Sequence, residues 1–498
     1  MKRLLILIVL CSFVILPSTI FAFPSVYPTG TTIYKPEKCW NGYTIMSNNP
    51  GPTLFDMNGN EVKKWDIRAG APNRILPGGY LMTSMNKGKG TPSTMVQVNW
   101  EGNIVWKFNR FEKMSAPPGG KKGGKKGDTK GAAPKGTKGQ APGGPSAEQW
   151  SSTMHHDWQR EGAPSGYYAP GMEPMVDKGK TLILGRTIRN NPKINSNPLK
   201  DDVLYEVSWD GKVLWKWWFS DHVDEMGFNE DEFKSMQSRR QPTLTWFWTN
   251  CASWLGPNKW YDAGDERFHP DNIIWDSKTT NILGITDRKT GKIVWQVGPR
   301  YDASPQLKKL GWIIGPHKTH MIPKGLPGAG NILVFDNGGG DGYGTGSPNS
   351  NWLAERDYSR IIEFDPMTLE IVWEYSGKTL GLTMQNWFQV YSNYISCAQR
   401  FPNGNTLITE GATGRVIEVT RDLETVWEYV SPHLITPSGG PGGLKPTAPT
   451  PKVYRAYRVP YEWVPQLKKP KEVPVIPPGI QNFKVQGAGD NYKGYVKK

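Results

Sequence analysis

One pattern of apolar and polar residues recurs six times along the chain. In each copy an apolar strand leads into a turn rich in Asp, Asn or Gly, and the next strand alternates apolar and polar residues. Such alternation around a short polar turn is typical of a β-hairpin, because successive side chains of a strand point to opposite faces. Each copy ends in a tryptophan, namely Trp65, Trp106, Trp215, Trp295, Trp373 and Trp427.

Further strand-like segments lie between these hairpins, for example residues 73–84, 179–188, 330–339 and 402–411. A hairpin with additional strands, repeated six times, indicates the blades of a β-propeller. The abundance of glycine (56), proline (42) and tryptophan (22) also favours a turn-rich, all-β fold over a helical one. We therefore predict a six-bladed β-propeller over residues 23–433, with an irregular β-sandwich as the alternative.

Three segments interrupt or follow the repeat. Residues 116–147 contain no apolar residue larger than alanine, so they cannot bury a core, and we expect a Lys/Gly-rich disordered insertion. Residues 221–264 mix helix-forming residues with several tryptophans, which predicts a lid or an extra wall of a site. Residues 434–498 form a Pro-rich C-terminal extension, which we expect to pack across the propeller as extended chain.

The N-terminus has the pattern of a secretory signal peptide. Lys2 and Arg3 precede the apolar run 4–16, and Ala22 ends a cleavage site. We expect residues 1–22 to be removed and the protein to be exported, into the periplasm or out of the cell. The apolar run is short for a bilayer span, so stable membrane insertion is not expected.

The charge and the cysteines exclude several classes of function. Much of the formal net charge of +15 is local, because residues 116–147 carry seven lysines and one aspartate. The remaining chain is mildly basic, and no nucleic-acid-binding module is recognisable. After export Cys39, Cys251 and Cys397 remain, which permits one disulfide at most without indicating the pair. No CxxC motif indicates a zinc ribbon or a haem attachment site.

Familiar catalytic signatures are missing from the sequence. It contains neither HExxH nor GxSxG, and the phosphate-loop-like residues 119–126 lack the required Ser or Thr. The glycine-rich residues 338–346 follow a strand but precede no helix, so they do not predict a dinucleotide site. We therefore expect no nucleotide-dependent chemistry and no cofactor.

Histidine placement carries the strongest signal for function. The chain has seven histidines, and five of them lie in three clusters, each just before a strand that follows the tryptophan of a blade. Innermost strands of a propeller line the central channel, so equivalent positions from several blades converge on the axis. We expect one shared site formed by His155 and His156, by His269, and by His317 and His320. The alternative is that these are separate structural histidines.

The residues near the histidines favour an oxyanion ligand over a metal. The clusters lack a His-x-His pair or a Glu ligand, so no metal site is expected. Arg288 follows the strand after His269, and arginine binds tetrahedral oxyanions through paired hydrogen bonds. Asn272 adds an amide donor. Histidine, arginine and asparagine together suit a sulfuryl or phosphoryl group.

Five segments resemble the bacterial arylsulfotransferases that work without a nucleotide sulfate donor. They are "HHDW", "FHPDNIIWD", "DRKTGKIVWQVG", "GPHKTHMIPKGLPGAGNILVFDNGGG" and "AQRFPNGNTLITEG", and the resemblance covers residues 42–460 apart from the Lys/Gly-rich insertion. It implies an aryl sulfate donor, a phenolic acceptor and a histidine that is transiently sulfated.

The resemblance also implies roles for individual residues. By motif position, His317 is the nucleophile, with His320 as the alternative, and Arg288 binds the sulfuryl oxygens with Asn272 and His269. His156, with His155 as a competitor, exchanges the phenol proton. The chain departs from the family where Pro316 replaces a glutamine and where Asp271 separates Asn272 further from His269.

Two other classes of protein remain as alternatives. A non-catalytic exported propeller scaffold would require the histidine clusters to be coincidental. A quinoprotein-like dehydrogenase would require a calcium site of carboxylates and eight blades, which the sequence does not indicate. The sequence leaves the oligomeric state open, a homodimer included.

Overall fold

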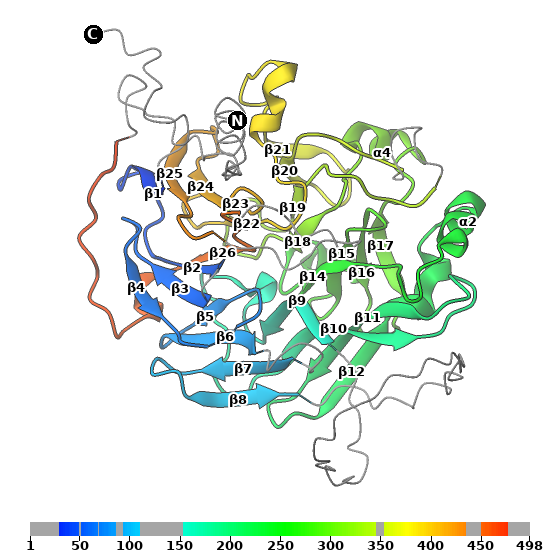
Figure 1. Ribbon diagram of the computed structural model, residues 1–498, viewed down its shortest axis with the longest axis horizontal. Coiled ribbons are helices and arrows are strands. Elements are labelled where there is room, and N and C mark those ends of the chain that lie inside the picture. Colours follow the sequence, from blue (N-terminus) through cyan, green and yellow to red (C-terminus); the bar gives the residue numbers. More distant parts are fainter. Residues whose placement is uncertain are drawn as a thin grey trace, which may run out of the picture.

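Within the part of the chain that the structure describes, the strands form six sheets that stand around a central axis as propeller blades, and all their pairings are antiparallel except that of β11 with the short β13 (Figure 1). The computed structural model describes residues 29–48, 51–67, 69–85, 93–109, 153–344, 353–434 and 450–476. The expected signal peptide and the expected Lys/Gly-rich insertion lie outside the described residues. The predicted all-β, six-bladed fold is confirmed.

The first three blades, given from the axis outward, are built as follows. Blade 1 contains β26 (Ala456–Val459), β2 (Tyr43–Asn48), β3 (Gly51–Phe55) and β4 (Glu61–Lys64). Blade 2 contains β5 (Arg74–Leu76), β6 (Tyr80–Met85), β7 (Thr94–Val98) and β8 (Ile104–Phe108). Blade 3 contains β9 (Thr153–Arg160), β10 (Thr181–Arg189), β11 (Leu199–Val207) and β12 (Val213–Trp218), and β11 also pairs with the short β13 (Leu244–Thr245).

The remaining blades repeat this order. Blade 4 contains β14 (Thr249–Trp254), β15 (Ile273–Ser277), β16 (Ile282–Thr286) and β17 (Ile293–Val297). Blade 5 contains β18 (His317–Met321), β19 (Ile332–Asp336), β20 (Arg360–Phe364) and β21 (Ile371–Ser376). Blade 6 contains β22 (Cys397–Arg400), β23 (Thr406–Glu410), β24 (Arg415–Val419) and β25 (Thr425–Val430), with β1 (Gly30–Tyr34) at its outer edge.

The helices are short and lie in the connections. The longest is α2 (Glu230–Ser238), whose start is fixed by a capping box in which Asn229 and Glu232 bond to each other's backbone N–H. The other helices are η1 (Pro164–Gly166), η2 (Phe219–Glu225), α3 (Lys259–Asp262), η3 (Glu266–Phe268), α4 (Pro305–Leu310), η4 (Met384–Gln389) and η6 (Tyr461–Trp463). None of the helices in the described ranges is long and apolar enough to cross a membrane.

Both ends of the chain close the ring. Strand β26 pairs with β2, so that Ala456 lies opposite Met46 and Val459 opposite Tyr43. Strand β1 pairs with β25 on the outer edge of blade 6. The propeller therefore extends beyond the boundary expected at residue 433, because the C-terminal extension supplies the innermost strand of blade 1. This strand is short, which is why its part in the sheet is hard to recognise in sequence.

A ring of tryptophans joins each blade to the next. One indole N–H in each blade donates to a backbone oxygen in the outer hairpin turn of the following blade, at 2.7–3.2 Å; the pairs are Trp65 with Asn99, Trp106 with Trp209, Trp217 with Gly291, Trp295 with Pro366, Trp373 with Arg421 and Trp427 with Met57. Five of these donors are the tryptophans that end the predicted hairpins. In blade 3 the donor is Trp217, two residues after the expected Trp215.

Bulges in the innermost strands aim side chains at the axis. The pairing of β18 with β19 shifts register between His317 and His320, and Lys318 between them has a φ of +53°. The pairing of β9 with β10 also shifts, and His156 within that bulge has a φ of +58°. A bulge sets extra residues against one partner and redirects their side chains, and it is common beside functional sites.

The segment 221–264 has two roles. Strand β13 forms part of a wall of the central cavity, as expected for an insertion beside a site. Strand β14, however, is the innermost strand of blade 4, because it pairs with β15 and lies next to β9 and β18. This part of the segment is therefore blade and not insertion. Cys39, Cys251 and Cys397 have free thiols in the structure.

Candidate active site

A cavity of about 840 Å³ lies at the end of the channel where the innermost strands begin. Its walls come from the start of β9, β14 and β18, from the residues just before β22 and β26, and from loops of blades 3 to 5. The lining residues include His156, Lys200, Arg239, Trp248, Asn250, Lys278, His317, Asp341, Tyr343, Tyr394, Ile395, Lys452 and Tyr454. Two of the seven predicted site residues, His156 and His317, are therefore brought together here.

His317 is a neutral histidine with a defined tautomer. Its Nδ1 lies 2.7 Å from Oδ1 of Asn337 and 3.1 Å from the Gly315 carbonyl oxygen. Asn337 donates its own amide hydrogens to the Ser392 and Ile395 carbonyls, so its Oδ1 accepts and Nδ1 of His317 carries the proton. The lone pair on Nε2 accepts the backbone N–H of Ile395 at 3.0 Å.

The surroundings keep this histidine uncharged. Burial, together with the positive charges of Arg455 and Lys278, lowers the pKa of His317 to about 3. A neutral imidazole with an unprotonated Nε2 is the nucleophilic form of histidine. His317 therefore meets the chemical requirement for attack on an electrophile.

His156 is an inner member of a hydrogen-bonded chain of four groups, which runs from Trp248 to Asp202. Its Nε2 lies 3.1 Å from the indole nitrogen of Trp248, and its Nδ1 contacts Nδ1 of His155. Nε2 of His155 lies 3.2 Å from Oδ1 of Asp202. An indole nitrogen donates only, and an ionised carboxylate accepts only, so both ends of the chain fix its direction. His156 therefore holds its proton on Nδ1 and presents the Nε2 lone pair toward Trp248.

Asp202 is ionised because arginine compensates its burial. Burial alone would raise the pKa of Asp202, but the charge of Arg186, 2.6 Å away, and the contact with His155 lower it to about 2. Burial also lowers the pKa of His155 and, helped by the neighbouring His155 and Arg186, lowers the pKa of His156 further. Both histidines are consequently neutral at ordinary pH.

Cations and one amide accompany the histidines. The ammonium group of Lys278 pairs with Asp341 at 2.5 Å, and Lys200, Arg239 and Lys452 line the same cavity. Nδ2 of Asn250 donates one hydrogen to the Pro316 carbonyl at 2.9 Å, and its second hydrogen stays available. These groups make the cavity suited to an anion.

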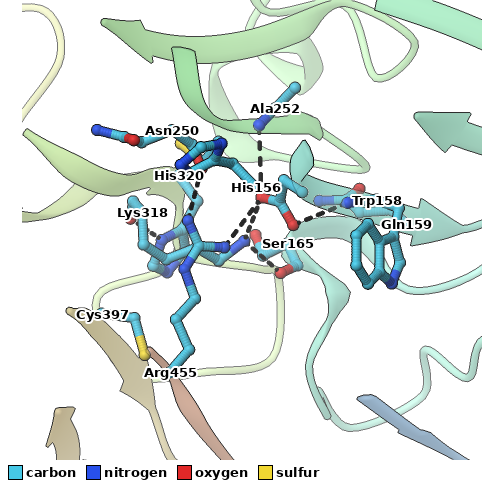
Figure 2. A network of polar contacts seen from close by, with 12 residues as sticks. His156, Trp158, Gln159, Ser165, Asn250, Ala252, Lys318, His320, Cys397 and Arg455 are labelled. Carbon is cyan, nitrogen blue, oxygen red and sulfur yellow. Dashed lines mark hydrogen bonds and ion pairs between the residues drawn. The ribbon is translucent and has the colours of Figure 1, made fainter. Parts of the chain in front are cut away.

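Asp157 and Lys318, the chain neighbours of the cavity residues His156 and His317, belong to a buried ionic cluster, here called the floor. Figure 2 shows Lys318 and Arg455 of this cluster together with His156. Arg74, Arg455 and Lys318 approach the Asp157 carboxylate at 2.5, 3.4 and 3.5 Å. Burial opposes ionisation of Asp157, but these three cations outweigh it and lower its pKa. Three cations around one carboxylate leave the floor positively charged, which further favours an anion above it.

His320 belongs to this floor and not to the cavity. The bulge at Lys318 turns it away from His317, and its Nε2 lies 2.8 Å from the hydroxyl of Tyr167. Its Nδ1 bonds to the Lys318 carbonyl oxygen at 2.8 Å, and it is completely buried. Between the two candidates for nucleophile, only His317 reaches the cavity. His155 lies behind His156, as described above.

The structure does not bring His269, Asn272 and Arg288 together with His317. They surround a separate hollow of about 420 Å³, where Arg288 pairs with Glu206 at 3.3 Å. Asn272 donates to backbone oxygens of Glu266 and Arg267 and fixes the β14–β15 connection.

The alternation of strand direction explains this separation. β14 begins at the cavity, so the loop that follows β14 lies at the opposite end of the blade. His269 and Asn272 are in that loop, and Arg288 follows β16, which ends at the same side. A place for His269 on the axis requires β15 to be the innermost strand of blade 4, whereas β14 occupies that position.

Sequence reasoning missed Asn250 and Lys278. Asn250 lies in β14, and Lys278 directly follows β15 at the cavity end of blade 4. The six-residue run 249–254 is buried throughout, and its sequence shows no alternation of apolar and polar residues, so no periodic signal marks it as the innermost strand before His269. Because β14 is the innermost strand, Asn250 and Lys278 of blade 4 line the cavity, in the place that the family resemblance implies for Asn272 and Arg288.

A search of curated proteins finds no match. Similar solved structures include a protein of unknown function from Bacteroides caccae (10% identity, TM-score 0.38, covering 84% of this chain and 98% of that chain). They also include the Dos1 propeller, with 9% identity and a TM-score of 0.31, covering 86% of this chain and 78% of that chain. A streptogramin B lyase has 11% identity and a TM-score of 0.31, covering 86% of this chain and 93% of that chain. These similarities are too distant to indicate a function.

Fold and site together define a class of protein, a six-bladed β-propeller with a neutral histidine in a cationic cavity on its axis. The arylsulfotransferase (ASST) family matches residues 173–431, from before β10 to the end of blade 6. This chain belongs to the arylsulfotransferase family, and the resemblance expected from the sequence is confirmed. Membership of this family supports sulfuryl transfer as the general type of activity.

Proposed function

We propose that this protein transfers a sulfuryl group from an aryl sulfate to a phenol through a sulfohistidine at His317. The observation that carries the proposal is the neutral His317, whose Nε2 lone pair lies in a cavity lined by cations. Aromatic rings of Trp248, Tyr394 and Tyr454 line the same cavity and would contact the aryl groups.

In the first half-reaction, Nε2 of His317 attacks sulfur as the bond from sulfur to the aryl oxygen breaks. The electron pair of that bond leaves with the phenolate, which takes a proton from water. Lys278 and the free amide hydrogen of Asn250 face the negative charge on the sulfuryl oxygens. Fixed donors of this kind stabilise a transition state effectively because they need no reorganisation.

The backbone N–H of Ile395 has a particular place in this step. It lies 3.0 Å from Nε2 and bonds to the lone pair before reaction. Once that lone pair bonds to sulfur, the N–H has lost its acceptor and lies beside the sulfuryl oxygens. We therefore assign it as a donor to the sulfohistidine.

In the second half-reaction the oxygen of the acceptor phenol attacks sulfur, and the electron pair of the S–N bond returns to Nε2 of His317. The phenol proton passes to Nε2 of His156, where the hydroxyl replaces the indole N–H of Trp248. The imidazolium so formed donates through Nδ1 to His155, which in turn donates to Asp202. The negative Asp202 stabilises this charge until the proton leaves to solvent.

Mass spectrometry tests the proposal directly. Incubation with 4-nitrophenyl sulfate and no acceptor should add the mass of one sulfuryl group, mapped to His317 under mildly alkaline conditions. His317→Gln should lose both the adduct and the transfer to phenol, while His433→Gln, outside the site, should keep both. Transfer that survives in His317→Gln without an adduct would contradict the covalent route. Absence of any transfer in the unaltered protein would favour a non-catalytic scaffold.

The compartment is also part of the proposal. The N-terminal sequence leads us to propose an exported protein, periplasmic or secreted, that acts on small phenols without a cofactor. Among the described residues, no group of three His, Cys, Asp or Glu side chains is arranged to hold a metal ion.

A further inference from the structure

The cavity carries more positive charge than the transfer of one sulfuryl group requires. Its lining contains the cations Lys200, Arg239, Lys278 and Lys452 but only one carboxylate, Asp341, within the residues that the structure describes. An aryl sulfate brings a single negative charge, which Lys278, Asn250 and the charged floor already face. Two of the other cations, Lys200 and Lys452, therefore call for a separate explanation.

Lys452 is the most informative of them. It is half-buried just before β26, and its ammonium group lies 4.9 Å from the ring centre of Tyr394. No carboxylate in the described part of the chain lies within ion-pair distance of it. Burial lowers its pKa, as expected for an ammonium group that has lost water without gaining a counter-ion. An arrangement of this kind is stabilised when an anion enters.

Lys200 extends the positive surface. It lies on β11 beside Thr245 of β13, its side chain is exposed, and it has no ion-pair partner among the described residues. It lines the same cavity from the blade 3 side, whereas Lys452 lines it from blade 1. Of the lysines that line the cavity, Lys278 is the one whose charge lowers the pKa of His317 most. We therefore infer that Lys200 and Lys452 face parts of a ligand farther from the sulfuryl group.

Asp341 does not neutralise these charges. Burial raises the pKa of Asp341 to about 7 against the opposing effect of Lys278, so its carboxyl group is only partly ionised at neutral pH. It also lies next to Lys278, at 2.5 Å, and forms no ion pair with the other two lysines. The part of the cavity lining that the structure describes consequently has an excess of positive charge.

We propose that the cavity selects phenols and aryl sulfates that carry a second anionic group on the aryl part, held by Lys452 and Lys200. The inference rests on the proposed function, because donor and acceptor must present their phenolic oxygens to the same sulfuryl group in turn. Their rings therefore occupy the same cavity, and one anion subsite serves both substrates. The ring would lie against Tyr394 and Tyr454 while its anion meets Lys452.

A matched pair of acceptors tests the subsite. 4-Hydroxyphenylacetate and 4-hydroxyphenylacetamide have the same shape, and only the first is an anion. With 4-nitrophenyl sulfate as donor, kcat/KM for the acid should exceed that for the amide by about tenfold, as for one charge-assisted contact in a partly buried site. The ratio should fall toward one in Lys452→Gln and by a smaller factor in Lys200→Gln. Lys212→Gln, on the exposed turn between β11 and β12, should leave it unchanged.

Calorimetric binding of the same two compounds separates this inference from the proposed function, since it needs no turnover. Tighter binding of the acid, lost in Lys452→Gln, supports the subsite even if no transfer is detected. Equal affinity for acid and amide overturns the subsite, whether or not the protein transfers sulfuryl groups. Preference for the acid that persists in both lysine variants also overturns the assignment of these residues.

Discussion

The indole N–H of Trp248 donates a hydrogen bond to Nε2 of His156 across the boundary between blades 3 and 4, at 3.1 Å. Because tryptophan can only donate, this contact sets the direction of the chain through His155 to the Asp202 carboxylate. A histidine whose proton position is fixed from both ends is ready to accept a proton at one defined atom. This chain of Trp248, His156, His155 and Asp202, called the relay below, is thus assembled by two neighbouring blades.

Removing the relay should slow the second half-reaction more than the first. In His155→Gln or Asp202→Asn, the imidazolium on His156 loses its support, and we expect transfer to phenol to slow by roughly 10–100-fold. Release of 4-nitrophenol in the first turnover should change little, because the departing phenolate needs no general acid. Rapid-quench measurement of both steps checks this, with His433→Gln as the control. Equal slowing of both steps would contradict the assignment.

Lys278, and not Arg288, should stabilise the sulfuryl oxygens. Loss of one preorganised donor typically lowers the rate by roughly 10²–10³-fold, which we expect for Lys278→Ala in the formation of the adduct. Arg288→Ala should change this rate by no more than about twofold, since Arg288 pairs with Glu206 around a separate hollow. Single-turnover kinetics of both variants decide the matter. A larger loss of rate in Arg288→Ala than in Lys278→Ala would instead support Arg288 as the residue that binds the sulfuryl oxygens.

Adduct formation should persist at acidic pH. The pKa of His317 is about 3, below the ordinary value of 6.5, so the lone pair is retained as the pH falls from 8 to 5. Asp341, with a pKa of about 7, gains a proton over the same range, which removes a negative charge and leaves the attraction for an anionic donor undiminished. The rate at pH 5 should therefore equal or exceed that at pH 8.

An ordinary histidine would behave differently, because about 97% of it is protonated at pH 5 and the rate would fall roughly thirtyfold. Samples quenched in alkali before the 4-nitrophenolate absorbance is read give the rate at each pH. In Asp341→Asn any rise toward acid pH should disappear. A fall by a factor of ten per pH unit below 6.5 would show that His317 is not held neutral.

The hydrogen bonds of the tryptophans that join neighbouring blades should contribute measurably to stability. Trp217→Phe removes the donor to the Gly291 carbonyl and should lower the free energy of unfolding by about 1–3 kcal/mol. Trp215→Phe is a matched control two residues away, half-buried and outside the ring, and should cost less than about 1 kcal/mol. Denaturant unfolding of the two variants measures the difference. An equal loss of stability in both variants would mean that the hydrogen bond from Trp217 to Gly291 adds nothing beyond packing.

The sequence by itself determined the repeat and its chemistry. Alternation around polar turns and the regular tryptophans predicted six blades, because the two-residue period of a strand is visible in any half-buried hairpin. The rarity of histidine made the clusters at His156 and His317 visible, and the motifs around them identified the family. These are local features, readable from neighbouring residues.

Only the tertiary structure decided which residues share the cavity. The two ends of each strand lie on opposite faces of the propeller. If the innermost strand of a blade is overlooked, the next strand is assigned to the axis, and a loop on the far face is then assigned to the site. That is what separates His269, Asn272 and Arg288 from Asn250 and Lys278, since the fully buried β14 shows no alternation. The pairing of β26 with β2 joins residues more than 400 positions apart, and no local pattern records such a contact. Lys452 and Tyr454 reach the cavity through it, because closure of the ring, and not the sequence around them, brings them to the axis.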